Sequence, residues 1–336
     1  MNNQTSSLEF SHFPVMLNEV LKISSPSTKE KFIDCTFGGG GYSKEILKFS
    51  KTNVLAIDRD KKVLAEVKKI SKKYPRRFKF HQLKFSQLET ISIDNVDVAI
   101  FDLGLSSIQL DDFDRGFSFK SSKKLNMTMG LNEISALEAI NNLSEIDLKL
   151  VIKILGDEKE ATKIARNIVN HRNTHKIQNT NELVKIIEKS KKRNYSNKIN
   201  PCTKTFQALR IFVNKELTEL IKGIINATRK LKPGGKLLII SFHSIEDRIV
   251  KYFFTNFSKN RSRPSRYLPE TKALDTALFE PYKNKILRPS KDEINQNIRS
   301  RSAKLRFAIR SKNKFEYPFD LIKKFKNYLD LESINV

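Results

Sequence analysis

Strand-like and helix-like segments alternate along the first third of the chain. Stretches rich in apolar and β-branched residues, typical of buried strands, cover residues 31–37, 53–57, 78–85 and 96–103. Between the first three of them, apolar residues recur with helical spacing at 42–49 and 61–73. Strands that alternate with helices form a parallel sheet with helices on its faces. The order therefore predicts an α/β fold with a doubly wound, Rossmann-like sheet.

The same alternation returns late in the chain. Residues 205–231 carry apolar side chains three or four positions apart and predict one long helix, which ends at the Pro-Gly-Gly sequence 233–235. A strand pattern follows at 236–242, and another lies at 304–309, where Leu, Phe and Ile alternate with other residues. These segments are expected to complete the sheet.

The region between the two parts has helical patterns throughout. They cover residues 134–143, 146–155, 161–171 and 181–190. Ser144 and Asp147 form a capping-box signature before the second of them, and the polar, basic stretch 191–204 is expected to lead back to the sheet. We therefore predict one α/β domain made of residues 1–132 and 202–336, interrupted by a helical insertion at 133–201.

Four successive glycines, 38–41, stand between the first predicted strand and its helix. Without side chains the backbone turns tightly there, and a ligand can lie against its N–H groups. Asp58 ends the second strand, where a carboxylate can bind both ribose hydroxyls of a nucleoside cofactor. The alternatives are a glycine turn without a ligand and a helix-capping carboxylate, a role that suits Asp60 better than Asp58.

The glycine pattern bears on which cofactor binds. A dinucleotide fingerprint that starts at Gly38 or Gly39 needs another glycine at position 43 or 44, where the chain has Ser43 and Lys44. The loop therefore favours S-adenosylmethionine, which has a ribose and an adenine but no phosphate, over a nicotinamide dinucleotide. The layout by itself leaves both open.

Two further residues stand at the ends of strands. Phe85 follows the third strand, where its ring is placed to stack on adenine or to pack in the core. Asp102 ends the fourth strand and is followed by Gly104 and hydroxyl residues. A buried carboxylate is costly without a partner, and a cofactor ammonium group would be one.

Three patterns resemble metal or hydrolase sites, but each lacks a feature that such a site needs. His171 and His175 have the spacing of zinc ligands, but Arg172 replaces the glutamate of that motif. The acidic run 111–114 lacks the glycine and glutamate of a calcium loop. His243, Ser244 and Asp247 share one local turn and do not form a triad. With only two cysteines, far apart, we predict no metal site and no disulfide framework.

The chain is strongly basic, with 63 Lys and Arg against 37 Asp and Glu and a formal charge of +26. Residues 248–314 alone hold 18 basic and 5 acidic side chains. Such a charge favours a polyanionic partner, above all nucleic acid, although a solvated basic surface is the alternative. The longest apolar runs fall short of the ~18 residues of a membrane span, and residues 1–10 do not resemble a signal peptide, so a cytoplasmic protein is expected.

Taken together, the motifs resemble those of bacterial 16S ribosomal RNA cytosine-N4 methyltransferases over nearly the whole chain. The matches, in order, are HFPVMLNE from residue 12, the glycine loop 36–43, DRD at 58–60, the segment 102–112, RGFSF at 115–119, TFQALRI at 205–211, SFHSIEDR at 241–248 and RSAKLR at 301–306. Many ordered matches are specific in a way that one glycine loop is not.

This resemblance implies a fold, a substrate and a set of contacts. The implied fold is the sheet of class I methyltransferases, and the insertion is implied to help bind the RNA. The implied substrate is 16S rRNA or the small ribosomal subunit. The product is N4-methylcytidine in the decoding centre. The residues implied to bind S-adenosylmethionine are Gly40, Gly41, Tyr42, Asp58, Phe85, Asp102 and Gln109.

The chain departs from the family at three motif positions. Tyr42 stands where the family usually has His, Ile108 where it has Pro, and Asn126 where it has Asp. The first change is expected to alter only how the cofactor is held. Asn126 matters more, because a carboxylate has lost its charge in a loop expected to border the cleft.

For the reaction, acceptors aimed at the amine hydrogens of cytosine would activate its nitrogen. Our candidates are Asp102, or a main-chain carbonyl beside it, with His243 assisting or positioning the base. The base must leave its stack, and Phe117, Phe119 and Phe242 are candidates to receive it, with core packing as the alternative for each. Two other functions remain open: a methyltransferase with another acceptor, and a non-catalytic RNA-binding assembly factor.

Overall fold

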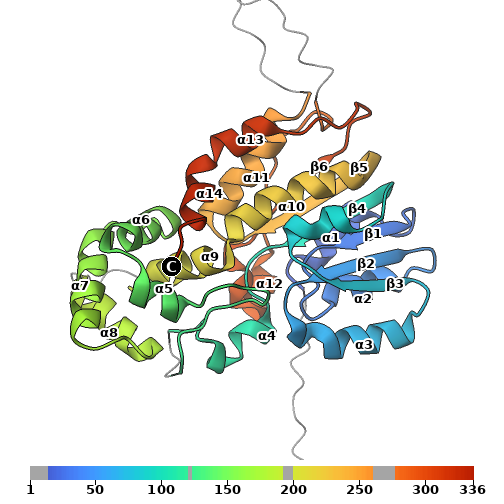
Figure 1. Ribbon diagram of the computed structural model, residues 1–336. Coiled ribbons are helices and arrows are strands. Elements are labelled where there is room, and N and C mark those ends of the chain that lie inside the picture. Colours follow the sequence, from blue (N-terminus) through green and yellow to red (C-terminus); the bar gives the residue numbers. More distant parts are fainter. Residues whose placement is uncertain (1–13, 120–122, 192–199, 260–276) are drawn as a thin grey trace, which may run out of the picture.

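The computed structural model describes residues 14–119, 123–191, 200–259 and 277–336. Six strands form one sheet in the order β3-β2-β1-β4-β5-β6, parallel except for β6, which runs antiparallel to β5 (Figure 1). The predicted doubly wound α/β fold is therefore confirmed. The strands are β1 (Lys31–Asp34), β2 (Asn53–Asp58), β3 (Phe78–Gln82), β4 (Val96–Asp102), β5 (Leu231–Ser241) and β6 (Lys304–Ile309).

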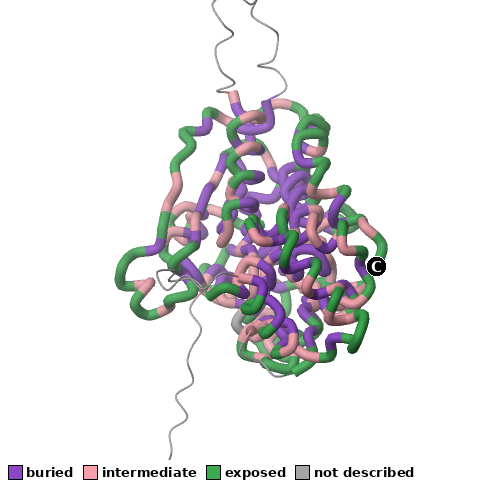
Figure 2. Tube along the Cα trace, turned by 90° about the vertical axis from the view of Figure 1, so that its left-hand side faces the viewer, coloured by how far each residue is buried: buried purple, intermediate pink, exposed green. Residues whose placement is uncertain are grey.

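Helices cover both faces of this sheet because alternate strand residues point to opposite sides. In β4, Val98 and Ile100 pack into one core with α1 (Leu17–Ser24), α2 (Gly41–Leu47) and α3 (Leu64–Lys73). Ala99 and Phe101 join the other core, with α10 (Glu216–Lys230) and α11 (Ser244–Asn256). Every residue of β4 before Asp102 is buried, and all of them except Asp97 are apolar. Figure 2 shows the buried segments gathered in the middle of the molecule.

The long helix predicted at 205–231 is two helices, and that prediction was wrong. α9 (Thr203–Asn214) and α10 meet at Lys215, which has a left-handed backbone with φ of 50°. The buried Asn214 fixes the break, because its side chain donates to the carbonyls of Met127 and Arg210 and accepts from the N–H of Met129, all at 2.8 Å. Apolar spacing continues across Lys215, so periodicity alone does not reveal the break.

The predicted insertion contains α5 (Ala136–Asn142), α6 (Glu145–Leu155), α7 (Ala161–Thr174) and α8 (Thr180–Ser190), grouped beside the sheet in Figure 1. Ser144 caps α6 by accepting from the N–H of Asp147 at 3.1 Å, as its signature predicts. Apolar residues of α6 and α7 belong to the same continuous core as α9 and α10. The domain limits at 132 and 202 stay a prediction, and 192–199 of the return stretch lie outside the described residues.

Short elements complete the described chain. They are α4 (Ser107–Leu110), α12 (Lys291–Gln296), α13 (Phe319–Lys324), α14 (Lys326–Glu332) and the 3₁₀ helices η1 (Lys61–Val63), η2 (Phe85–Thr90), η3 (Phe113–Arg115) and η4 (Ile298–Ser302). Glu332 of α14 reaches the first turn of α10 and accepts from the N–H groups of Leu217 at 3.0 Å and Thr218 at 2.8 Å. Within the described ranges, no helix combines the length and the apolar character that crossing a membrane requires.

Candidate active site

The glycine loop lies between β1 and α2. Gly38 and Gly40 have left-handed backbones, with φ of 50° and 73°. A Cβ at Gly40 would lie 2.7 Å from Ile70 and 2.8 Å from the ring of Phe37, and one at Gly41 would lie 2.8 Å from Pro14. A Cβ at Gly39 would meet nothing within 4 Å. Close packing therefore explains Gly40 and Gly41, and Gly39 is the position that leaves open space for a ligand.

Asp58 holds this loop in place. Its two oxygens accept from the N–H groups of Gly38 and Asp60, both at 2.8 Å. Burial raises the pKa of Asp58 to about 6, against the lowering effect of those N–H groups. Each carboxylate oxygen keeps a further lone pair, so the hydroxyls of a ribose can still bind. The cap of η1 is Asp60, which accepts from the N–H of Lys62 at 3.0 Å, as the alternative assignment had it.

Gln109 binds within the protein instead of facing open space. Its amide donates to Asp60 at 3.1 Å, and its carbonyl accepts from the N–H of Ser106 at 3.0 Å. Arg115 forms an ion pair with the same Asp60 carboxylate. Gln109 is buried, so it ties the turn after β4 to the end of β2. The predicted contact between Gln109 and the cofactor stays a prediction.

Asp102 has an oxygen without a partner. Its Oδ2 lies 3.2 Å from the hydroxyl of Tyr42, which also contacts the carbonyl of Val15 at 2.5 Å, whereas its buried Oδ1 has no hydrogen-bond partner among the residues that the structure describes. Burial raises the pKa of Asp102 to about 8, and the Tyr42 hydroxyl only partly opposes this. A buried carboxylate with a vacant acceptor suits a positively charged ligand, such as the ammonium group of S-adenosylmethionine.

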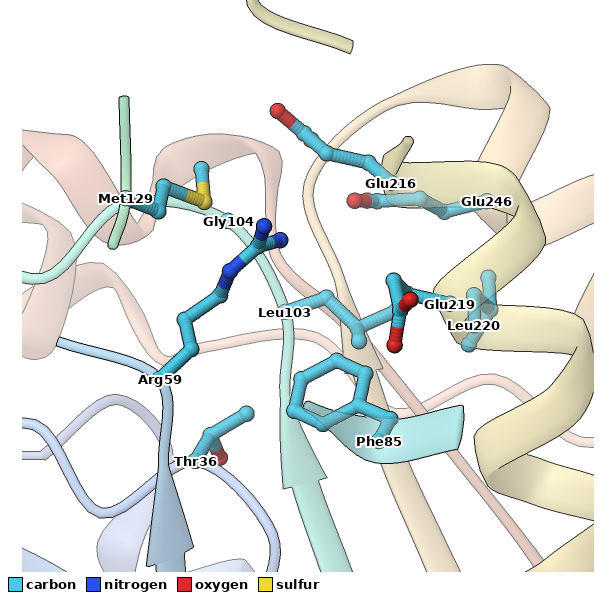
Figure 3. Close-up of a pocket in the computed structure, with 10 residues that line it drawn as sticks. All are labelled: Thr36, Arg59, Phe85, Leu103, Gly104, Met129, Glu216, Glu219, Leu220 and Glu246. Atoms are coloured by element: carbon cyan, nitrogen blue, oxygen red, sulfur yellow. The ribbon is translucent and has the colours of Figure 1, made fainter. Parts of the chain in front are cut away.

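A pocket opens beyond the ends of β1 and β4, and Leu103, which follows Asp102 in the chain, is one of its lining residues (Figure 3). The ring of Phe85 forms one wall and packs edge-to-face on Phe101, with ring centroids 5.3 Å apart. Because β3 ends at Gln82, Phe85 belongs to η2 and not to the predicted strand. The residues that line the pocket are Thr36, Arg59, Phe85, Leu103, Gly104, Met129, Glu216, Glu219, Leu220 and Glu246.

Arg59, Glu216, Glu219 and Glu246 were missed by the sequence analysis. Arg59 donates to the carbonyls of Gly130 at 2.8 Å and Asn214 at 2.9 Å, which fixes it at the pocket. Glu219 is held by the N–H of Ser86 at 2.9 Å. Glu216 and Glu219 lie in the first turn of α10, so recognising the helix break at Lys215 would have singled them out.

His243 begins α11 and forms a capping box with Glu246. Its Nδ1 accepts from the N–H of Glu246 at 3.4 Å, and the Glu246 carboxylate accepts from the N–H groups of His243 at 3.3 Å and Phe242 at 2.8 Å. The buried His243 Nε2 lies 3.1 Å from Oε1 of Glu246, but within the described residues it has no well-aligned hydrogen bond. Burial alone would raise the pKa of Glu246, but His243 and Arg210 lower it overall, which keeps Glu246 a carboxylate.

One group of side chains invites the question of a metal. Glu216, His243 and Glu246 bring potential ligand atoms within 4.8 Å of one another. However, Nδ1 of His243 is a hydrogen-bond acceptor, so the proton of the neutral ring is on Nε2. A protonated Nε2 has no lone pair for a metal ion, and metal binding would require the cap of α11 to break.

Other predicted residues lie apart from the pocket lining. Phe117 is buried, and Phe119 packs edge-to-face on Phe206 at 6.1 Å, so both serve the core as their alternative reading had it. Phe242 packs over Gly104, where a Cβ would lie 3.4 Å from its ring. Asn126 is exposed, and its side chain accepts from the N–H of Thr128 at 3.0 Å. His12 and Phe13 of the first motif lie outside the described residues.

Comparison with known proteins agrees with this geometry. The profile of the MraW methylase family matches residues 9–311. Ribosomal RNA small subunit methyltransferase H of Ehrlichia ruminantium (strain Welgevonden) is 44% identical over 302 residues, covering 88% of this chain and 98% of that protein. The protein of the same name from Rickettsia africae (strain ESF-5) is 43% identical over 300 residues, with 89% and 97% covered.

Among solved structures, a putative methyltransferase from Streptococcus mutans in complex with SAH has a TM-score of 0.39. It is 10% identical and covers 87% of this chain and 97% of that chain, a likeness too low to bear on function. The sequence matches are far stronger and extend over most of the chain. The chain therefore belongs to the MraW methylase family, which confirms the predicted resemblance and makes S-adenosylmethionine its methyl donor.

Proposed function

We propose that this protein methylates the exocyclic N4 amine of a cytidine in the decoding centre of 16S rRNA, and that it acts in the cytoplasm. The names of the relatives, which are ribosomal RNA small subunit methyltransferases, support an rRNA substrate. The observation that carries the proposal is the pocket itself. Its wall holds the carboxylates of Glu216 and Glu246 and includes Leu103, whose neighbour in the chain, Asp102, has a buried oxygen without a hydrogen-bond partner among the described residues.

The vacant oxygen of Asp102 and the open side of Gly39 fit the charged and the ribose parts of the methyl donor. We assign the ammonium group to Asp102, the ribose to Asp58 and the adenine to the wall formed by Phe85, with the backbone of Gly40 and Gly41 and the hydroxyl of Tyr42 supporting the loop. When bound, S-adenosylmethionine supplies a methyl carbon on a positively charged sulfur. The chain then has to hold an amine in line with that carbon.

The amine of cytosine is a weak nucleophile, because its lone pair is shared with the ring. As the nitrogen–carbon bond forms, the carbon–sulfur bond breaks and its electron pair stays on the sulfur. The nitrogen meanwhile becomes positive and must release one proton. Carboxylates in the pocket stabilise that positive charge, and either they or water can take the proton.

The deciding experiment maps modified nucleosides in small-subunit rRNA by mass spectrometry. RNA from a strain without this gene should lack one N4-methylcytidine, and the purified protein with S-adenosylmethionine should restore it on isolated small subunits. A methyl group that appears on a protein or on another base would refute the cytidine assignment. Methyl transfer to nothing in the subunit would favour the non-catalytic alternative.

Asp58→Asn is expected to weaken the binding of S-adenosylmethionine by about 10- to 100-fold, because hydrogen bonds to a charged group contribute about 1.5–3 kcal/mol. The asparagine NH₂ group would also face one of the two N–H groups that Asp58 now accepts from. Titration calorimetry measures the effect, with Asp112→Asn on the surface as the matched control. Equal affinity in the two variants would remove Asp58 from the site.

RNA binding is expected to weaken steeply as salt rises, because phosphate contacts release counterions. In the basic segment, residues 248–314, the side chains of Lys283, Lys285 and Arg288 are exposed. Changing all three to Gln should therefore lower the slope of log Kd against log salt by about 2 to 3. The matched control changes Lys68, Lys72 and Lys73, which are exposed on α3. Fluorescence anisotropy at several salt concentrations compares the two triple variants. Equal slopes would mean that the RNA does not bind at Lys283, Lys285 and Arg288.

A further inference from the structure

Two carboxylates, from different helices, meet at one end of the pocket. Glu216 lies in the first turn of α10 and Glu246 in the first turn of α11, and both line the pocket (Figure 3). Their ligand-type oxygens lie within 4.8 Å of each other. An NH₂ group that donates to two acceptors, at about 2.9 Å each and 120° apart, needs them about 5 Å apart. The two oxygens therefore lie somewhat closer together than one amine between the two side chains would need, by an amount that a small side-chain movement supplies.

Each carboxylate is held in place by a different partner. Arg210 donates to both oxygens of Glu216, at 2.8 and 2.9 Å, and this pair leaves the remaining lone pairs of the carboxylate unused. The N–H groups of Phe242 and His243 donate to Oε2 of Glu246, at 2.8 and 3.3 Å. Oε1 of Glu246 receives no backbone hydrogen bond. Both acceptors are therefore oriented before any substrate arrives.

A third polar group lies next to them. The side chain of His243 is 8% exposed, and its Nε2 lies 3.1 Å from Oε1 of Glu246, but within the described residues it has no well-aligned hydrogen bond. Because Nδ1 accepts from the N–H of Glu246, Nε2 carries the proton and is a donor. A buried donor whose nearby acceptor is poorly aligned can gain a better-aligned acceptor from a ligand.

We propose that Glu216 and Glu246 accept the two hydrogens of the target amine and that His243 donates to the ring nitrogen beside it. This assignment deepens the proposed function and rests on it. Cytosine has this edge, with an NH₂ group next to an unprotonated N3, whereas uracil has an oxygen and a protonated N3 in the same places. The two carboxylates then lie where positive charge develops during methyl transfer, a role that we had given to Asp102.

The cofactor-side residue and the base-side residues are thus different. Asp102 faces the donor, whereas Glu216, Glu246 and His243 face the acceptor. Substitutions on the base side should leave cofactor affinity unchanged and slow the transfer step. This separation makes the assignment testable by two independent measurements.

The first test uses variants that keep the fold. Glu216→Gln and Glu246→Gln keep the shape of the side chain, and Gln still serves the capping box of α11. We expect single-turnover methylation of small subunits at saturating S-adenosylmethionine to slow about 100-fold in each, with the cofactor Kd within twofold of wild type. Glu45→Gln, on the surface, is the control. Rates within twofold of wild type, or a rate that depends on an added divalent metal, would overturn the assignment.

The second test isolates His243 from its structural role. His243→Asn keeps an acceptor for the cap of α11 but removes the Nε2 donor. On a subunit with 3-deazacytidine at the target position, which lacks N3, wild type should slow about 10-fold, and His243→Asn should lose nothing further. On cytidine the same variant should slow about 10-fold, and the exposed His175→Asn should not change.

If the loss from removing N3 and the loss from His243→Asn multiply on the 3-deazacytidine subunit, the two changes are independent, and His243 does not contact N3. These results are distinct from a failure of the proposed function. If wild type makes no N4-methylcytidine at all, the function is wrong. If wild type makes it and the variants do so equally well, only the assignment of these three residues is wrong.

Discussion

Replacing Asp102 by Asn is expected to weaken S-adenosylmethionine binding more than 100-fold and, at the same time, to stabilise the ligand-free protein. The vacant Oδ1 of Asp102 is the acceptor that we assign to the ammonium group, and an amide lacks the charge that would hold it. The ligand-free protein, in contrast, carries a buried carboxyl group that is costly to ionise. One substitution should therefore separate binding from stability.

The sign of the stability effect follows from the pKa. Burial raises the pKa of Asp102 to about 8 from a usual 3.8, so the group favours folding in its protonated form and this contribution is lost as pH rises from 4 to 8. Asn cannot ionise, so the two proteins should be closest in stability near pH 4. At pH 8.5 the variant should be more stable, by on the order of 3 kcal/mol. Urea unfolding at several pH values measures this.

Calorimetry gives the other half of the test. In wild type the Asp102 carboxyl must lose its proton to pair with a cation, whereas the α-ammonium group of S-adenosylmethionine loses its own proton at about pH 8. Affinity should therefore rise with pH up to about 8 and fall above it. The variant should have weak affinity with no such rise. If Asp102→Asn binds as tightly as wild type at pH 8.5, the vacant oxygen does not face the cofactor.

Replacing Asp247 by Ala is expected to reduce the free energy of unfolding by about 3–5 kcal/mol, the usual cost of leaving a buried charge without its partner. Arg306 is 2% exposed, and its Nε donates to Asp247 at 2.7 Å. The same guanidinium donates to Tyr282 at 3.0 Å and to Asn284 at 2.8 Å. It therefore joins α11, β6 and the segment before α12.

Changing both partners should cost less than changing one. Asp247→Leu together with Arg306→Met removes the charge as well as its partner, so urea unfolding should recover most of the stability lost in Asp247→Ala. Asp112→Ala breaks an exposed ion pair with Lys62 and should cost about 0–1 kcal/mol. A loss below 1 kcal/mol for Asp247→Ala would mean that water or Tyr282 compensates the charge of Arg306.

The fold was predictable because its signals are local. The inner parallel strands β1, β2 and β4 are buried on both faces and read as mostly apolar runs, whereas the edge strand β3 is largely exposed, and the helices between the strands have one apolar side. The helix break at Lys215 was not predictable, because it depends on hydrogen bonds between Asn214 and residues more than 80 positions away in the chain. Tertiary hydrogen bonds of this kind leave no periodic signal in a sequence.

The residues that we propose for the cofactor could be chosen from the sequence, whereas those that we propose for the base could not. Asp58 and Asp102 end strands, and the fold brings the ends of parallel strands to one edge. Glu216 and Glu246 start helices, where acidic residues are ordinary because they favour the helix dipole. Their role depends on where α10 and α11 begin in space, which spacing along the chain does not contain.

The count of basic residues overstated the RNA-binding surface. Arg306 and Arg310 belong to the basic segment, but both are buried and bound to protein groups. Residues 260–276 of that segment lie outside the described residues. Net charge therefore predicts the kind of partner, whereas the phosphate contacts have to be chosen from exposed side chains such as Lys283 and Lys285.

The contact between Glu332 and α10 forms late in the synthesis of the chain. The N–H groups that Glu332 receives belong to Leu217 and Thr218, in the same helical turn as Glu216. A ribosome synthesising this protein delivers residue 332 more than a hundred residues after that turn. Until then the turn lacks these two hydrogen bonds. A nascent chain still short of residue 332 therefore has the segments of the sheet and the glycine loop, but the turn that places Glu216 in the pocket wall is not yet held by Glu332.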